Sequence, residues 1–135
     1  MRRLACALML AATVGGCNAV GEPGGPKRFS DADVPFTFEI PADFTPADVD
    51  RGNSRGAVIA AVGLSKVDVL AVRRISGTPG TQFAGGEVHE VLGWRVTSDL
   101  RHLRGDWWLE CQYTPDFATK VRAACARAVA TVKPK

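Results

Sequence analysis

The end of the chain joins two apolar patterns of different period across a single Thr-Pro pair. Residues 107–113 alternate strictly, and one face of the resulting strand carries Trp107, Leu109, Cys111 and Tyr113. Beyond this strand the apolar residues recur every three to four positions, which is the period of an amphipathic helix. Thr114 is expected to cap this helix with its hydroxyl. A strand followed directly by a helix predicts an α+β domain in which the helix folds back over the sheet.

Each of these two elements contains one cysteine. Cys111 lies four residues before Pro115, which is about 13 Å along a strand. Cys125 lies ten residues after Pro115, which is about 15 Å along a helix. If the helix lies antiparallel on the strand, the two sulfurs are level, and both lie on faces assigned to the core. We therefore predict a Cys111–Cys125 disulfide. Two buried free thiols are the alternative, while a zinc site is disfavoured because His89 and His102 show no ligand spacing with either cysteine.

The first residues have the pattern of an export signal. Two arginines precede an uncharged, mostly apolar run from Leu4 to Val14, which is shorter than the ~20 residues that a membrane-spanning helix needs. Val14-Gly15-Gly16-Cys17 then resembles the lipobox of bacterial lipoproteins. The resemblance implies cleavage before Cys17, a diacylglyceryl thioether on its sulfur, and acyl chains such as palmitate. The alternative is ordinary secretion with cleavage after Ala19.

These features divide the chain into three parts. We predict a signal peptide at 1–16, a lipidated Cys17 with a flexible tether over 17–34, and a single α+β domain over 35–135. The tether prediction depends on a stretch rich in glycine and proline with little apolar content. Sixteen extended residues of it would reach roughly 55 Å. We expect the protein on the outer face of the cytoplasmic membrane, where oxidising conditions let the two remaining cysteines pair.

Several further segments complete the expected sheet. Strands are predicted at 36–40, 57–62, 67–75, 87–92 and 94–103. Because 57–62 and 67–75 are rich in β-branched residues, we expect them to form a hairpin at the middle of the sheet. Thr45-Pro46-Ala47-Asp48 has the sequence of a helix start and predicts one helical turn. The expected fold is an antiparallel sheet of about five to six strands with a C-terminal helix packed on one face.

Three stretches of the domain carry a resemblance to a known family. They are Phe-Thr-Phe-Glu-Ile-Pro-Ala-Asp-Phe at 36–44, Glu-Cys-Gln-Tyr-Thr at 110–114, and Ala-Cys-Ala-Arg-Ala-Val-Ala-Thr-Val-Lys at 124–133. Together with the lipobox, they resemble small actinobacterial exported lipoproteins whose domain is similar to the Mog1/PsbP fold. The resemblance implies a twisted antiparallel sheet with helices packed on it, and it brings no catalytic residues. This chain offers one full helix, so it stays open whether the second sheet face is covered.

The residue pattern excludes several classes of function. Residues 1–16 contain two of the 17 basic residues and none of the 14 acidic ones, so the formal charge falls from +3 to +1 without them. A nearly neutral chain lacks the basic excess of a nucleic-acid binder. The histidines, serines and aspartates form no recognisable triad, and no Gly-x-Ser-x-Gly motif occurs. We expect no enzyme activity, no cofactor and no metal site.

The candidate surface site lies on the strand face opposite Cys111. If no second layer covers this face, Trp108 forms an exposed patch with Trp94 and with Arg73 or Arg74. The favoured alternative buries Trp108 in a second small core, because tryptophan is highly buried on average.

The predicted function is that of a membrane-anchored, non-catalytic binding module of the cell envelope. Its partners would be the membrane, through the lipid on Cys17, and an envelope protein. A carrier of a hydrophobic ligand such as lipid is the alternative, and a hydrolase ranks last.

Overall fold

The computed structural model describes residues 25–49, 57–77 and 86–135. The predicted signal peptide and Cys17 lie outside the described residues. Within the described ranges, no helix has the length and apolar character to cross a membrane.

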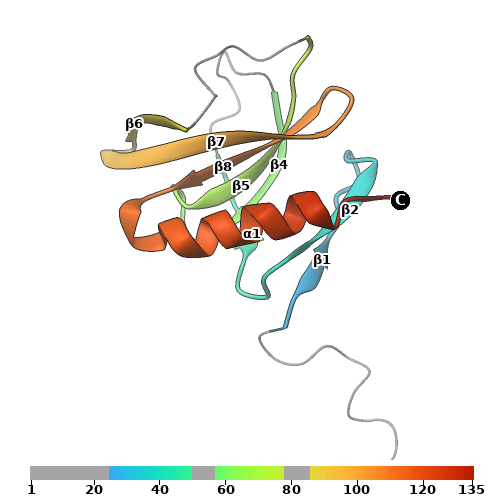
Figure 1. Ribbon diagram of the computed structural model, residues 1–135, viewed down its shortest axis with the longest axis horizontal. Helices are drawn as coiled ribbons and strands as arrows, with labels where there is room; N and C mark the ends of the chain where they lie inside the picture. Colours follow the sequence, from blue (N-terminus) through green and yellow to red (C-terminus); the bar gives the residue numbers. More distant parts are fainter. Residues whose placement is uncertain (1–24, 50–56, 78–85) are drawn as a thin grey trace, which may run out of the picture.

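A six-stranded antiparallel sheet forms the body of the domain (Figure 1). Its spatial order is β3-β4-β5-β8-β7-β6. The strands are β3 (Thr45–Pro46), β4 (Ala57–Gly63), β5 (Val69–Arg74), β6 (Glu87–Val91), β7 (Trp94–Arg104) and β8 (Trp107–Tyr113). The predicted central hairpin is confirmed, because β4 pairs with β5 and places Val62 opposite Leu70. The predicted α+β class is confirmed as well.

A small second sheet brings the two ends of the described domain together. It contains β1 (Lys27–Phe29), β2 (Phe36–Ile40) and β9 (Lys133–Pro134), in the order β1-β2-β9. The alternation predicted for 36–40 is present, since β2 turns Phe36, Phe38 and Ile40 into the core.

The C-terminal helix covers one face of the large sheet. A short 3-10 turn, η2 (Pro115–Phe117), leads into α1 (Ala118–Ala130), which packs on β8 and β2 (Figure 1). The predicted disulfide is present, with the Cα atoms of Cys111 and Cys125 6.1 Å apart. Strand rise and helix rise therefore bring the two sulfurs to the same level, as the spacing predicts.

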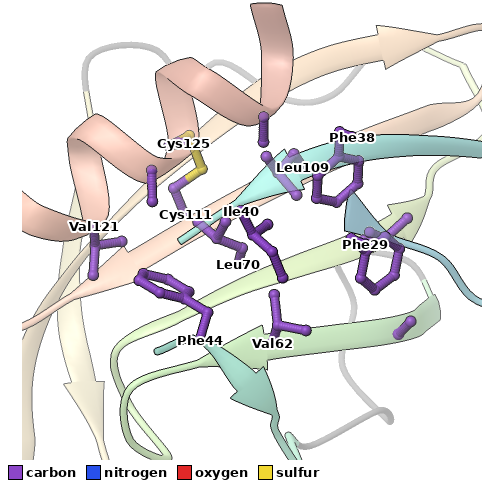
Figure 2. Packing of buried hydrophobic residues seen from close by; sticks show 14 of the residues in the cluster. Phe29, Phe38, Ile40, Phe44, Val62, Leu70, Leu109, Cys111, Val121 and Cys125 are labelled. Atoms are coloured by element: carbon purple, nitrogen blue, oxygen red, sulfur yellow. A yellow bond between two sulfur atoms is a disulfide. The ribbon is translucent and has the colours of Figure 1, made fainter. Parts of the chain in front are cut away.

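The main core lies between α1, the small sheet and the large sheet. Figure 2 shows Phe44 and Leu70 below the disulfide and Phe38 and Leu109 to one side of it, all within one core. Phe29 stacks on Phe38 with ring centroids 4.6 Å apart. Residues far apart in the sequence thus bury one another's apolar surface, which is the main source of stability in a domain of this size.

The folded domain begins earlier than the sequence predicts. The expected tether reaches to residue 34, but β1 pairs with β2, and Phe29 and Val34 are buried. These two apolar residues lie in a polar, glycine-rich stretch that has no periodic apolar pattern, so the sequence does not mark them as core residues. Their burial depends on the surface that β2 offers.

Two local predictions near the turns are wrong. Thr45 and Pro46 form strand β3 opposite Gly63 and Val62 instead of a helical turn, because pairing with β4 outweighs the local capping sequence. Thr114 precedes the helix as expected, but its hydroxyl makes no capping hydrogen bond. That hydroxyl donates to the carboxylate of Asp68 instead.

Candidate functional site

The sheet face away from α1 has a buried ion pair at its centre. Arg73 on β5 donates from Nε to Oε1 of Glu110 on β8 at 2.6 Å. The side chains are 5% and 4% exposed, respectively. Strand register explains the contact, because Arg73 lies opposite Trp108, two residues from Glu110 on the same face. Burying two charges is costly unless they pair, so each residue depends on the other.

A row of polar side chains continues from this pair toward the sheet edge. Gln112 donates from Nε2 to the carbonyl of Val67 at 3.2 Å, and its Oε1 lies 3.5 Å from the Ser98 hydroxyl. His89 Nε2 lies 2.9 Å from the same hydroxyl. A serine beside a histidine can act as a nucleophile when substrate reaches it. Ser98 is 0% exposed, however, so this pair links β6 to β7 rather than facing a substrate.

A cleft of about 460 Å³ opens on this face. Its lining combines charged and polar side chains with apolar ones, among them Lys66, Arg73, His89, Glu110, Val69 and Leu92. Because a buried ion pair forms part of its wall, the cleft is poorly suited to a purely hydrocarbon ligand.

Of the four residues of the predicted surface patch, Arg73 and Trp108 are neighbours on β5 and β8, but Trp94 and Arg74 do not join them. Arg73 is buried with Glu110, while Arg74 turns to the other face and lies 5.2 Å from the Trp107 ring. Trp108 lies opposite His102, which is eight residues along β7 from Trp94, or roughly 26 Å.

The favoured alternative for Trp108 is not observed either. The second small core consists of Val58, Ala61 and Ala71, and Trp108 is not part of it. Trp108 is half-buried against His102, with ring centroids 4.7 Å apart. Its indole Nε1 is buried and has no hydrogen-bond partner within the described ranges.

Sequence reasoning missed a cluster of exposed apolar side chains at one end of the sheet. Leu92, Trp94 and Phe117 are 70%, 59% and 41% exposed, respectively. They come from the β6–β7 turn, the start of β7 and η2, and they line one cavity of about 250 Å³. We call these three residues the apolar tip. Large apolar side chains that gather on a surface commonly mark a site of interaction.

Leu92 adopts a backbone conformation that leucine rarely takes. Its φ is 52°, and the following Gly93 has a φ of 80°. A two-residue hairpin turn with positive φ at both positions normally carries Asn, Asp or Gly, because a bulky side chain clashes there. Strain of this kind persists where the side chain is needed for another reason. The Leu-Gly pair between two strands was the available signal in the sequence.

A buried carboxylate fixes the wall of the tip cavity. Asp68 Oδ1 accepts hydrogen bonds from Thr114 N at 2.8 Å and Thr114 Oγ1 at 2.9 Å. Ser65 Oγ donates to Asp68 Oδ2 at 2.7 Å. These bonds fasten the β4–β5 turn to the junction of β8 and η2. The cavity therefore has preformed walls, which lowers the entropic cost of binding.

No group of three or more histidine, cysteine or acidic side chains is placed to hold a metal ion among residues 25–49, 57–77 and 86–135. The polar contacts of the site run between protein groups.

Comparison with known proteins yields a likeness among solved structures. No protein-family model matches the chain. No curated protein matches its sequence. Among solved structures, the chain is similar to the solution structure of cyanobacterial PsbP (CyanoP) from Synechocystis sp. PCC 6803. The two are 15% identical, the match covers 90% of this chain and 99% of that chain, and the TM-score is 0.45. The likeness is one of overall chain path and transfers no residue role to this chain.

Proposed function

We propose that this protein is a membrane-anchored, extracytoplasmic and non-catalytic binding module that holds an envelope protein through its apolar tip. The observation that carries the proposal is the convergence of Leu92, Trp94 and Phe117 around one preformed cavity. Exposing three large apolar side chains lowers solubility unless a partner covers them.

The anchoring part of the proposal has separate support. The lipobox at 14–17 argues for a lipid on Cys17. The disulfide between Cys111 and Cys125 fits an oxidising compartment, since thiols are kept reduced in the cytosol.

The alternative functions receive less support from the geometry. The tip cavity measures about 250 Å³, and sites for small molecules are typically ~300–1,000 Å³. The larger cleft contains the Arg73–Glu110 ion pair, which disfavours a lipid carrier. A hydrolase would need an accessible nucleophile, and Ser98, the serine beside His89, is 0% exposed.

Capture from crosslinked envelopes tests the tip. We would compare the unmodified chain with Leu92→Asn/Trp94→Ser and with the matched control Val88→Ser, since Val88 is also 55% exposed but lies outside the tip cavity. The proposal expects a protein that the unmodified chain and the control recover and that the tip variant loses. Equal recovery by all three chains, or nothing above background, contradicts the proposal.

Intact-mass analysis of the membrane fraction tests the anchor. We expect the mature chain to begin at Cys17 and to carry the mass of a diacylglyceryl group with one further acyl chain. Cys17→Ser should shift the protein out of the membrane fraction. A soluble, unmodified wild-type chain would contradict the anchoring.

A further inference from the structure

The chain enters the described domain beside a groove on the outer side of α1. This groove has a volume of about 440 Å³. We call the surface around it the tether face, formed by Pro26, Ile40, Pro41, Lys120, Ala123 and Arg127. Pro26 is one residue from the start of β1, so whatever precedes the domain leaves it at this face.

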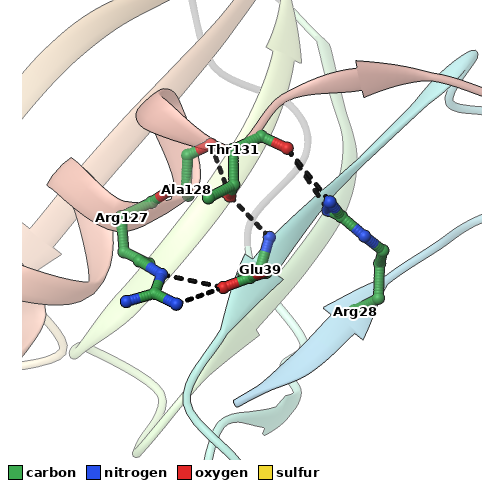
Figure 3. A network of polar contacts seen from close by, with 5 residues as sticks. All are labelled: Arg28, Glu39, Arg127, Ala128 and Thr131. Atoms are coloured by element: carbon green, nitrogen blue, oxygen red, sulfur yellow. Dashed lines mark hydrogen bonds and ion pairs between the residues drawn. The ribbon is translucent and has the colours of Figure 1, made fainter.

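The tether face is held together by polar contacts between the first strand and the end of the helix (Figure 3). Arg28 donates from both terminal nitrogens to the carbonyl of Thr131, at 3.2 and 3.3 Å. The hydroxyl of Thr131 accepts a hydrogen bond from the backbone N–H of Glu39 at 2.8 Å. Arg127 donates from Nε to Oε1 of Glu39 at 2.8 Å. These contacts fasten the end of α1 to β1 and β2.

Positive charge is concentrated around this face. Helix α1 contains Lys120, Arg122 and Arg127 and no acidic residue. Lys120 and Arg127 lie along the tether face, while Arg122 lines a separate groove on the other flank of the helix. Lys27 and Arg28 add two further cations from β1.

The acidic residues nearby do not cancel this charge. Asp43 pairs with Lys120, and Glu39 pairs with Arg127. Asp31 lines a groove with Lys27 and Arg28, and Asp99 lines one with Arg122. The five cations of β1 and α1 against these four acids leave a formal excess of one positive charge. The chain from residue 17 onward carries a formal charge of +1, so its positive charge gathers on this side.

The length of the preceding chain limits how far this face can lie from a lipid anchor. Pro26 follows Cys17 by nine positions, a distance of roughly 32 Å when the chain is fully extended. A short connection raises the effective concentration of the membrane at the surface next to it, so weak electrostatic contacts suffice.

We propose that the tether face rests on the anionic surface of the membrane, with Lys27 and the cations on both flanks of α1 turned toward phospholipid headgroups. The proposal rests on the anchoring proposed above and adds which side of the domain meets the bilayer. Figure 1 shows β1 and β6 on opposite sides of α1, so this orientation leaves the β6–β7 turn and the apolar tip open to a protein partner.

Vesicle binding by a chain that lacks the lipid anchor on Cys17 tests the proposal. The chain from residue 17 with Cys17→Ser is titrated with vesicles of phosphatidylglycerol and phosphatidylcholine, and with vesicles of phosphatidylcholine alone. We expect binding to the anionic vesicles that weakens as salt is added, because the contacts are electrostatic. Equal binding to both vesicles, or none to the anionic ones, overturns the proposal.

Two triple variants of equal charge locate the surface. Lys120→Gln/Arg122→Gln/Arg127→Gln removes three cations of α1, and Lys66→Gln/Arg95→Gln/Arg104→Gln removes three exposed cations elsewhere. Each surface charge near an anionic membrane raises the binding affinity about fivefold, so the affinity of the α1 variant for anionic vesicles should fall about 100-fold. The control should lose much less. An equal loss in both variants overturns the proposal.

A double variant that keeps both ion pairs distinguishes weaker membrane binding from a folding defect. Lys27→Gln/Arg122→Gln keeps the Lys120–Asp43 and Arg127–Glu39 pairs, and we expect it to lose about 25-fold in binding with an unchanged thermal transition. Binding unchanged in this variant contradicts the proposal. The intact-mass measurement reports anchoring separately, so failure of the tether face and failure of the anchor are told apart.

Discussion

Asp68 is buried where the β4–β5 turn meets the junction of β8 and η2. Asp68 is 2% exposed, and its carboxylate accepts hydrogen bonds from Thr114 and Ser65. The hydroxyl of Ser65 in turn accepts the backbone N–H of Asp68 at 3.0 Å. A buried carboxylate is stable only when hydrogen-bond donors surround it, and this one secures the wall of the tip cavity.

Replacing Asp68 with alanine should destabilise the domain by about 3 kcal/mol, because buried donors on Thr114 and Ser65 lose a charged acceptor. Urea unfolding measures the change in the free energy of unfolding. Asp48→Ala, at an exposed aspartate, is the control and should change it by less than about 0.5 kcal/mol. Similar values for the two variants would show that the Asp68 contacts contribute little.

The positive φ of Leu92 lowers the stability of the domain, while its apolar side chain stays exposed. Leu92→Asn should raise the free energy of unfolding by about 0.5–1 kcal/mol, because asparagine tolerates the left-handed region better than leucine does. The same variant should lose partner capture. Because the variant is more stable than the parent, unfolding would not explain that loss. Urea unfolding and envelope capture are the two measurements. A variant that is less stable than the parent would contradict the strain argument.

Tyr113 is the chain's single tyrosine, so its ionisation can be followed directly. Burial raises its pKa above the ordinary value of 10.0, and the hydrogen bond and charge of Asp99 raise the pKa further, while Arg122 lowers it. The tyrosine hydroxyl donates to Asp99 Oδ2 at 3.1 Å.

The raised pKa has a defined effect on stability. The unfolded chain loses the phenolic proton first as pH rises past about 10, so the folded state loses stability from that pH upward until the folded pKa is passed. Absorbance at the tyrosinate band should show a midpoint above that of the urea-unfolded chain. In Asp99→Asn the midpoint should fall. A folded midpoint equal to the unfolded one would contradict the burial argument.

At the scale of elements, strand β8 contributes side chains to both faces of the large sheet. One face of β8 packs under α1 and carries Cys111, and the other face carries Glu110, whose partner Arg73 lies on the neighbouring strand β5. The disulfide joins this strand to the helix that follows it, across a sequence separation of 14 residues. The crosslink restrains the unfolded chain more than the folded one.

Removing the crosslink should lower stability without changing the fold. Cys111→Ala/Cys125→Ala should lose about 3 kcal/mol in the chain-entropy description of a loop of this length. Urea unfolding of the variant beside the oxidised parent measures the difference. The unmodified chain kept reduced provides the matched control, and it should resemble the double variant. A loss below about 0.5 kcal/mol would mean that the helix docks equally well without the bond.

At the scale of the whole molecule, the beginning and end of the described domain lie side by side. β2 is flanked by β1 on one side and by β9 on the other. Thr37 lies opposite Lys133, and Phe29 lies opposite Phe38. This pairing places β1, β9 and the end of α1 on one side of the domain.

Phe29→Ala tests whether the segment before β2 belongs to the domain. Phe29 is buried and stacked on Phe38, so its truncation should cost about 3 kcal/mol. Lys27→Ala, at an exposed position in the same strand, should be near neutral. Thermal and urea unfolding measure both. If Phe29→Ala proves as mild as the control, the segment acts as a tether after all.

The sequence by itself determined those features that depend on neighbouring residues. Alternation at 36–40 and 107–113 predicted two strands and the face that each buries, because side chains point to opposite sides of a strand in turn. The rise per residue of the strand and of the helix that follows it placed Cys111 and Cys125 at one level. The β-branched segments at 57–62 and 67–75 predicted the central hairpin. In each case the local pattern and the final contact agree.

Only the tertiary structure decided the contacts between segments that carry no pattern of their own. Phe29 becomes a core residue because β2 presents Phe38 to it, and Thr114 turns its hydroxyl to a carboxylate far away in the sequence. The apolar tip likewise depends on Leu92, Trp94 and Phe117 meeting from separate elements. Hydrophobic burial and hydrogen bonding stabilise contacts between surfaces that meet in space. A sequence pattern reports only what neighbouring residues share.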